Sequence, residues 1–217
     1  KPQNQLTQSD RTGDISLHDE LKAYIGAKYH KPGAVYLGLV HRMDRPVGGL
    51  VAFARTSKAA SRLSEQLRAR RMEREYLAVA EGDELPDRGR LCDALLQDGD
   101  TGSVRCVPEG TPGAQAAALS YEVLARQSGL SLVHVKLDTG RKHQIRAQLS
   151  HAGYPILYDM RYGYGQRGRS IALWGAVLRL EHPTLRKPMT FVSSPENGAF
   201  APFASFIKSF LDTASKE

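Results

Sequence analysis

The sequence predicts an α+β fold in which a largely antiparallel mixed sheet is flanked by helices. Segments with the composition of strands dominate, and several are joined by short turns, such as Gln127-Ser128-Gly129 between the apolar runs 119–125 and 130–137. Helical segments do not alternate regularly with strands, as they would in a doubly wound parallel sheet. The chain is long enough to bury a sizeable core and shows no internal repeat or low-complexity linker. We therefore expect one domain over residues 1–217.

Four segments are expected to be helical. The first follows Ser16, which has Asp19 at the capping-box position, and the second follows Thr56 or Ser57. The third covers 141–152, before Gly153, and the fourth lies near the end of the chain. By helical spacing, the inward-facing residues are Leu17, Leu21, Tyr24 and Ile25; Ala60, Leu63 and Leu67; Ile145, Leu149 and Ala152; and Phe203, Phe206, Ile207 and Phe210.

The expected strands are rich in β-branched and other apolar residues and are bounded by turn residues. They cover 35–40, 49–55, 76–80, 119–125, 130–137, 171–180 and 188–192. The stretch 83–118 is rich in Gly, Pro and Asp and poor in large apolar side chains. It is expected to be a loop with a weak strand or two.

The charge of the chain points to an anionic partner, nucleic acid before membrane. The formal net charge is +7 and the isoelectric point is about 9.5. No stretch approaches the ~18 apolar residues of a membrane-spanning helix. Cys92 and Cys106 are too few for a disulfide scaffold, and neither has the spacing of a zinc site. We expect a cytoplasmic protein with no bound metal.

The most informative feature is the tight turn His41-Arg42-Met43-Asp44, hereafter the HRMD turn, between two apolar segments. It places one carboxylate between Arg42 and Arg45, a setting suited to chemistry on a polyanion. The following Gly48-Gly49 is expected to let the backbone pass close to a ligand. An Asp that only braces its turn is the alternative.

A second run, 137–146, supplies a candidate counter-ion for Asp44. Arg146 follows Ile145 and so points away from the apolar stripe of its helix. The residues before that helix, Thr139 to Lys142, suit a phosphate through free amides and the helix dipole. A solvated helix face is the alternative. His143 and His151 lie too far apart along the helix to be a metal pair.

A basic segment precedes the strand that contains Tyr76. Residues 55–74 contain seven cationic side chains and only two acidic ones, Glu65 and Glu73. These cations are Arg55, Lys58, Arg62, Arg68, Arg70, Arg71 and Arg74. RNA binding and a solubilising surface both fit this segment. For Tyr76, core packing and stacking on a nucleobase both fit.

Taken together, these motifs resemble the RluA-type pseudouridine synthase family. The HRMD turn is similar to the family's H-R-L-D, 74–78 to its basic-x-Tyr-x-Ala strand, 139–146 to its T-G-R-x-H-Q-[IL]-R, and 151–163 to its H-x-G-x-P-I…D…Y-G. The last match includes Asp159 and Tyr162. This chain departs from the family in Met43 and in Val47-Gly48-Gly49, which stands in place of Thr-Ser-Gly.

The resemblance implies a single pseudouridine synthase catalytic domain that isomerises uridines in ribosomal or transfer RNA. Asp44 would be the nucleophile, Tyr76 would lie against the base and assist proton removal at C5, and Arg146 would pair with Asp44. No cofactor or metal is implied, because the base is only detached, turned and rejoined. RNA contacts are expected from Arg42, Arg45, Arg62, Arg68, Arg71, Arg141, Lys142, His143 and Gln144. Arg42 would help displace the target base. We expect a monomer.

Two other functions remain open from the sequence. One is a catalytically silent RNA-binding or ribosome-assembly protein on the same fold, although such a protein has little reason to keep Asp44, Tyr76 and Arg146 together. The other is a glycoside hydrolase, which needs a second carboxyl group that the HRMD turn does not contain.

Overall fold

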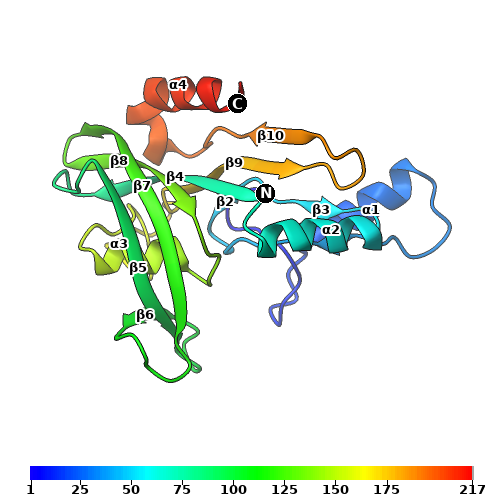
Figure 1. Ribbon diagram of the computed structural model, residues 1–217, viewed down its shortest axis with the longest axis horizontal. Coiled ribbons are helices and arrows are strands. Elements are labelled where there is room, and N and C mark those ends of the chain that lie inside the picture. The colour runs from blue at the N-terminus through cyan, green and yellow to red at the C-terminus, as the bar shows by residue number, and fades with distance from the viewer. Residues whose placement is uncertain (217) are drawn as a thin grey trace.

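The computed structural model describes residues 1–216, and a mainly antiparallel eight-stranded sheet lies at its centre (Figure 1). Seven strands run in the order β10 (Pro188–Val192), β9 (Leu173–Glu181), β4 (Glu73–Glu81), β8 (Leu130–Leu137), β7 (Gln115–Gln127), β5 (Arg88–Gln97) and β6 (Val104–Val107). The short β2 (Gly48–Gly49) pairs in parallel with β9. The predicted fold class, α+β with a largely antiparallel sheet, is confirmed.

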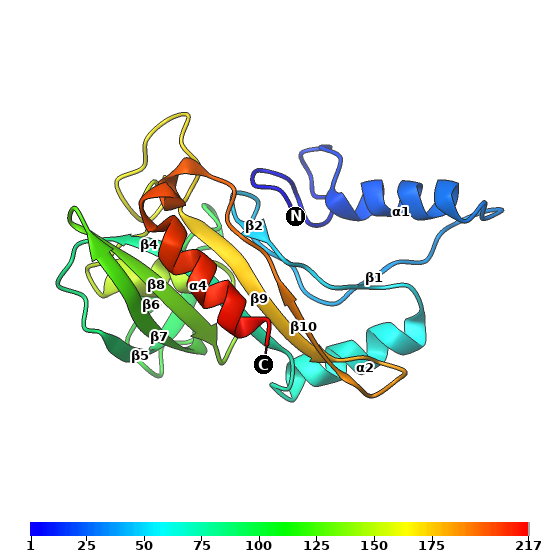
Figure 2. The ribbon, with the colours of Figure 1, turned by 90° about the horizontal axis from the view of Figure 1, so that it is seen from above.

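Helices cover both faces of this sheet. They are α1 (Leu17–Lys28), α2 (Ser57–Arg68), α3 (Gln144–His151) and α4 (Ala204–Ala214), with a short 3₁₀ helix at Gly198–Phe203. In Figure 1, α4 lies above the sheet and α3 below it. The view from above shows α1 and α2 at the far end, beside the small ladder of β1 (Gly38–Leu39) and β3 (Phe53–Ala54) (Figure 2). In residues 1–216, no helix is long and apolar enough to cross a membrane.

The helix starts follow the sequence signals. Ser16 accepts a hydrogen bond from the Asp19 amide, and the Asp19 side chain accepts one from the Ser16 amide, which completes the predicted capping box. Thr56 caps α2. Three predicted core positions were wrong, because Tyr24 is 56% exposed, Phe206 is 48% exposed and Ala152 is also exposed. Helix α1 therefore packs through a narrower stripe than its apolar pattern predicts, whereas α3 is buried at six consecutive residues, 144–149.

The central strands carry the main core. Leu77, Val79, Leu132 and Val135 are fully buried, and β4 is buried through six consecutive residues. Both faces of β4 lie under other elements, so its sequence is a nearly continuous apolar run in place of an alternating one. The polar side chains of β4 therefore lie at its ends, in 73–76 and at Glu81.

Residues 83–118 were predicted as a loop with a weak strand or two, and the strands are more extensive than that prediction. This stretch contains the ten-residue β5, the strand β6 and the start of β7, which together extend the sheet on one side. In β5 only Leu95 is buried, Leu91 is partly buried against the core, and Asp93 lies on the same face. The strands therefore form through pairing with β7, a long-range contact that leaves little apolar pattern in the sequence.

The strands expected at 35–40 and 49–55 are shorter than predicted. Only Gly38–Leu39 and Phe53–Ala54 pair with each other, and the intervening chain forms the HRMD turn and β2. Gly48 and Gly49 lie opposite Trp174 and Gly175 of β9. This docking fixes the HRMD turn to the main sheet.

Candidate active site

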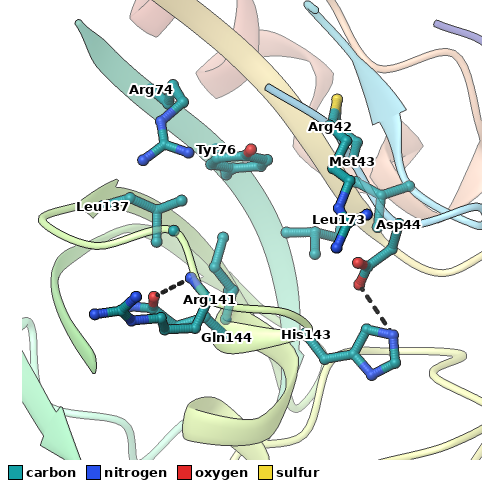
Figure 3. Close-up of a pocket in the computed structure, with 13 residues that line it drawn as sticks. Arg42, Met43, Asp44, Arg74, Tyr76, Leu137, Arg141, His143, Gln144 and Leu173 are labelled. Carbon is teal, nitrogen blue, oxygen red and sulfur yellow. Dashed lines mark hydrogen bonds and ion pairs between the residues drawn. The ribbon is translucent and has the colours of Figure 1, made fainter. Parts of the chain in front are cut away.

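A cleft of about 440 Å³ opens between the HRMD turn, β4 and the start of α3 (Figure 3). It is lined by Arg42, Met43, Asp44, Val47, Arg74, Tyr76, Leu137, Gly140, Arg141, His143, Gln144, Ile145 and Leu173. The three sequence motifs, far apart along the chain, therefore meet in one place. Among the described lining residues, Asp44 is the one that carries a carboxylate.

Asp44 is held by a well-braced turn. Its carbonyl oxygen accepts a hydrogen bond from the Val47 amide at 3.1 Å. On the preceding residue, Thr7 Oγ1 donates to the Met43 carbonyl at 3.0 Å and accepts from the Met43 amide at 3.2 Å. Since Thr7 and Met43 are both buried, this pair fixes the backbone from which the Asp44 side chain projects.

The two glycines after the turn serve strand docking. A Cβ on Gly49, whose φ is +120°, would lie 2.3 Å from the Gly175 carbonyl oxygen, and one on Gly48 would lie 2.2 Å from the Trp174 ring. The sequence interpretation, close approach of the backbone to a ligand, is corrected here. The close approach is to β9, and only glycine allows it.

Arg146 joins Asp44 to a second carboxylate. Its Nη1 donates to Asp44 Oδ2 at 3.1 Å, while its Nε and Nη2 donate to Asp159 Oδ2 and Oδ1, each at 2.8 Å. Asp159 is fully buried and also accepts from the amides of Arg161 and Tyr162. Burial alone would raise the pKa of Asp159, but Arg146 and these amides hold it below its ordinary value. Asp159 is therefore an ionised anchor for the guanidinium.

Sequence reasoning did not identify Asp159 as a site residue. The only signal was its place in the 151–163 stretch. Its burial against Arg146 also means that it is no second catalytic acid facing the cleft, which the glycoside hydrolase alternative requires.

His143 adds a hydrogen-bond donor beside Asp44. Its Nδ1 lies 2.7 Å from Tyr162 Oη, which also accepts from the Val104 amide at 2.8 Å. The Tyr162 proton is therefore directed at Nδ1, so the ring proton sits on Nε2, which lies 3.8 Å from Asp44 Oδ2. Burial, assisted by neighbouring cations and opposed by Asp44, lowers the pKa of His143 to about 4. The imidazole is thus neutral at physiological pH.

Tyr76 and Arg74 project from β4 into the same cleft (Figure 3). A register shift in the pairing with β9 falls between Glu75 and Tyr76. The Tyr76 side chain lies on the far side of the cleft from His143 and is 8% exposed. Burial raises the pKa of its phenol above the ordinary value, so the hydroxyl keeps its proton.

Arg74 was expected in the basic segment and as the first residue of the 74–78 motif, and the structure places it in the cleft wall. A Cβ on Gly140 would lie 2.5 Å from Arg74 Nη1, so a side chain at this position would require the guanidinium to shift. Its Nε is buried without a hydrogen-bond partner within the described residues. Arg74 thus brings a cation to the cleft opposite Asp44.

The other residues expected to bind RNA fall in different environments. Arg42, Arg141, His143 and Gln144 line the cleft, and Lys142 is exposed beside it. Gln144 is buried, and its amide holds the loop by accepting from the Arg141 amide at 3.0 Å and donating to the Ala118 carbonyl at 3.0 Å.

Arg45 is directed away from the cleft and joins the N-terminal segment to the HRMD turn. Its guanidinium lies 2.7 Å from Asp14 Oδ2, and its Nε donates to the Asn4 carbonyl at 3.1 Å. It therefore braces the protein chain in this structure.

The predicted cations of α2 and of the residues just after it also fall into two groups. Arg62 donates to the Pro183 carbonyl at 2.6 Å, whereas Arg68 and Arg71 are exposed, with Arg71 3.3 Å from Glu65. A second hollow of about 700 Å³ shares Arg74 and Leu137 with the cleft, and its lining reaches Leu67 and Arg70. The C-terminal end of α2 therefore adjoins a hollow that continues from the cleft.

Comparisons with known proteins agree with this geometry. Residues 1–151 match the family model described as RNA pseudouridylate synthase. The chain is 32% identical over 184 residues to ribosomal large subunit pseudouridine synthase C of Yersinia pestis, with 79% of this chain and 56% of the relative covered. It is 37% identical over 155 residues to an RNA pseudouridine synthase of Chloroflexus aurantiacus, with 70% and 48% covered.

A solved structure, human RNA pseudouridylate synthase domain containing 4, matches the fold with a TM-score of 0.77 at 22% identity, covering 96% of this chain and 88% of that one. The chain belongs to the RNA pseudouridylate synthase family. It spans about half the length of the curated relatives that it matches.

Proposed function

We propose that this chain isomerises selected uridines of structured RNA to pseudouridine, with Asp44 as the nucleophile. The observation that carries this proposal is the lone cleft carboxylate, 3.1 Å from Arg146 Nη1 and surrounded by Arg42, Arg74 and Arg141. A carboxylate held ionised beside a fixed cation can act on a substrate, while the other cations neutralise the phosphates of the RNA.

The reaction needs no redox partner. The C1′–N1 bond of the uridine breaks, the base turns, and a C1′–C5 bond forms. The proton on C5 is lost and N1 regains one, so the product is an isomer of the substrate. Asp44 supplies the nucleophile and Arg146 holds its carboxylate in place. Tyr76 lines the same cleft, and its hydroxyl can take up the C5 proton while it passes its own proton to water.

The target base must leave its stack to reach Asp44. Flipping costs a few kcal/mol, and contacts in the pocket recover that cost. The cleft offers the apolar side chains of Leu137, Ile145 and Leu173 and the ring of Tyr76 for the base. Arg42, exposed at the mouth, is positioned to occupy the space that the base vacates.

Ribosomal RNA is the first substrate to test, with transfer RNA as the second. One of the similar proteins named above is a ribosomal large subunit pseudouridine synthase, which favours ribosomal RNA. The residues that line the cleft come from one sheet, the HRMD turn docked on it and one flanking helix, and we propose that residues 1–217 form one catalytic domain. We propose a monomer as its working form.

Pseudouridine mapping tests the proposal. Ribosomal and transfer RNA from cells lacking this gene are incubated with the purified chain or with the Asp44→Asn variant, and pseudouridines are located by chemical labelling and sequencing. We expect new pseudouridines at a few positions with the wild-type chain and none with the variant. RNA binding without any new pseudouridine would contradict the proposal and favour the silent RNA-binding alternative.

A further inference from the structure

Three side chains with metal-binding atoms meet outside the cleft. Asp93 of β5, Cys106 of β6 and His151 at the end of α3 bring a carboxylate oxygen, a thiol sulfur and an imidazole nitrogen within 4.8 Å of one another. None of the three lines the cleft. Since β5 was not predicted and the residues lie far apart in the sequence, their spacing gave no sign of a site.

The fold explains why they converge. Cys106 pairs with Leu95 across the β5–β6 ladder, and Asp93 lies two positions before Leu95, so all three share one face of the sheet. Helix α3 packs on that face, with Cys106 Sγ 3.9 Å from the Ala147 carbonyl oxygen. His151 follows Ala147 by one helical turn and therefore reaches the same place.

We propose that Asp93, Cys106 and His151 form a binding site for Zn²⁺. Thiolate, imidazole and carboxylate are the ligands that zinc prefers, whereas Mg²⁺ and Ca²⁺ take oxygen ligands alone. Tetrahedral coordination requires the three atoms to draw together, and the exposed His151 side chain is free to turn inward. Water supplies the fourth ligand on the open side.

The surroundings already orient one of these ligands. Gln148 is 1% exposed, and its Nε2 donates to Asp93 Oδ2 at 2.6 Å, an outer-sphere contact of the kind that fixes metal-ligating carboxylates. Without metal, burial and the nearby Asp93 raise the pKa of the Cys106 thiol to about 11. Zinc must therefore displace the thiol proton, and its affinity increases with pH.

The bound ion would join the β5–β6 hairpin to α3. His143 and Arg146 lie near the N-terminal end of this helix, and His151 ends it. The site is therefore a structural link between the hairpin and the helix that carries the cleft residues, and the isomerisation itself proceeds without it. This inference does not depend on the proposed catalytic activity.

Cobalt titration of the full chain tests the site, because a Co²⁺–thiolate bond gives a charge-transfer band in the near ultraviolet. We expect the band to saturate at one equivalent of Co²⁺ and to be bleached by Zn²⁺. It should disappear in Cys106→Ser and persist in Cys92→Ser, the matched control at the exposed cysteine. His151→Gln should weaken binding by more than the ~10-fold that loss of an outer-sphere partner costs.

A thermal readout completes the test. One equivalent of Zn²⁺ should raise the melting temperature of the wild-type chain and of Cys92→Ser but leave Cys106→Ser unchanged. A band that survives in Cys106→Ser, binding that is insensitive to His151→Gln, or the absence of any band in the wild type would each overturn the proposal. His151 is exposed, so its substitution should leave the fold intact.

Discussion

Arg146 and Asp159 form a two-pronged ion pair in the interior, with Nε–Oδ2 and Nη2–Oδ1 both at 2.8 Å. The guanidinium side chain is 6% exposed and the carboxylate is fully buried. This pair leaves Nη1 of Arg146 directed at Asp44. Asp159 thus fixes the orientation of the arginine, and the arginine fixes the position of the candidate nucleophile.

Arg146→Met should destabilise the fold chiefly by leaving Asp159 as an unpaired buried charge, at a cost of ~3–5 kcal/mol. Adding Asp159→Asn to Arg146→Met should restore part of that loss. Adding Asp44→Asn instead should restore much less, because Asp44 is 21% exposed and can be hydrated. Urea unfolding of the single and double variants measures each coupling. Equal recovery from the two added substitutions, or strictly additive losses, would mean that Asp159 is not the main partner.

His41 should make the fold sensitive to mild acid. Its side chain is buried, and this burial, assisted by Arg74, lowers its pKa from 6.5 to about 4. The folded state therefore binds a proton on His41 less readily than the unfolded state does. The fold keeps its full stability above pH 6.5, and it loses stability as the pH falls from 6.5 to about 4. The loss is roughly 3 kcal/mol for a shift of this size.

The measurement is the free energy of unfolding at pH 7 and pH 4 for the wild type and for His41→Gln. The loss of stability that comes from His41 protonation should be absent in the variant. Nitrogen chemical shifts add a direct check. Because Nε2 accepts a hydrogen bond from the Ala52 amide at 3.1 Å, the neutral ring should carry its proton on Nδ1 at pH 6. An imidazolium at that pH would refute the assignment.

Tyr76→Phe separates the two roles proposed for this residue. The ring remains to contact the base, but the hydroxyl that assists proton removal is lost. The rate of pseudouridine formation at saturating RNA should fall by ~10²–10⁴-fold, the usual contribution of a general acid or base, while RNA affinity and stability hold. Single-turnover kinetics and a filter-binding assay give the two values. An undiminished rate would assign Tyr76 to packing alone.

The exposed cations at the C-terminal end of α2 and just after it, Arg68 and Arg71, should control affinity and leave chemistry unchanged. Arg68→Gln with Arg71→Gln should weaken RNA binding and lower its salt slope by ~0.7–0.9 per lost phosphate contact. All RNA sequences should weaken alike, because phosphates carry no base identity. Lys208→Gln is the matched control, since Lys208 is exposed on α4 across the sheet from α3. A reduced rate at saturating RNA with an unchanged salt slope would place α2 in the active site or mark it as structural.

The sequence predicted those parts of the molecule whose signals are local. The Ser16 capping box, the turn between β7 and β8, and the strand that carries Tyr76 all follow from residues that are near one another in the chain. The HRMD turn and the α3 motif were paired correctly as neighbours, because their charges are complementary and the family resemblance joins them.

The remaining features depend on contacts between distant segments. Strand β5 forms by pairing with β7, and its own residues give only a weak alternation of apolar side chains. The role of Asp159 exists only because α3 presents Arg146 to it. Gly49 looked like a residue that admits a ligand, since the sequence cannot reveal that the Gly175 backbone lies against it.

Asp44→Asn gives the most direct test of the proposed chemistry. The amide keeps the size of the carboxylate but cannot act as its nucleophile. Tritium release from RNA labelled at C5 of uridine is measured beside RNA affinity for the wild type and the variant. We predict that release stops while affinity is nearly unchanged. Release by the variant within ~10-fold of the wild-type rate, only ~1.4 kcal/mol in the barrier, would contradict the assignment of Asp44 as the nucleophile.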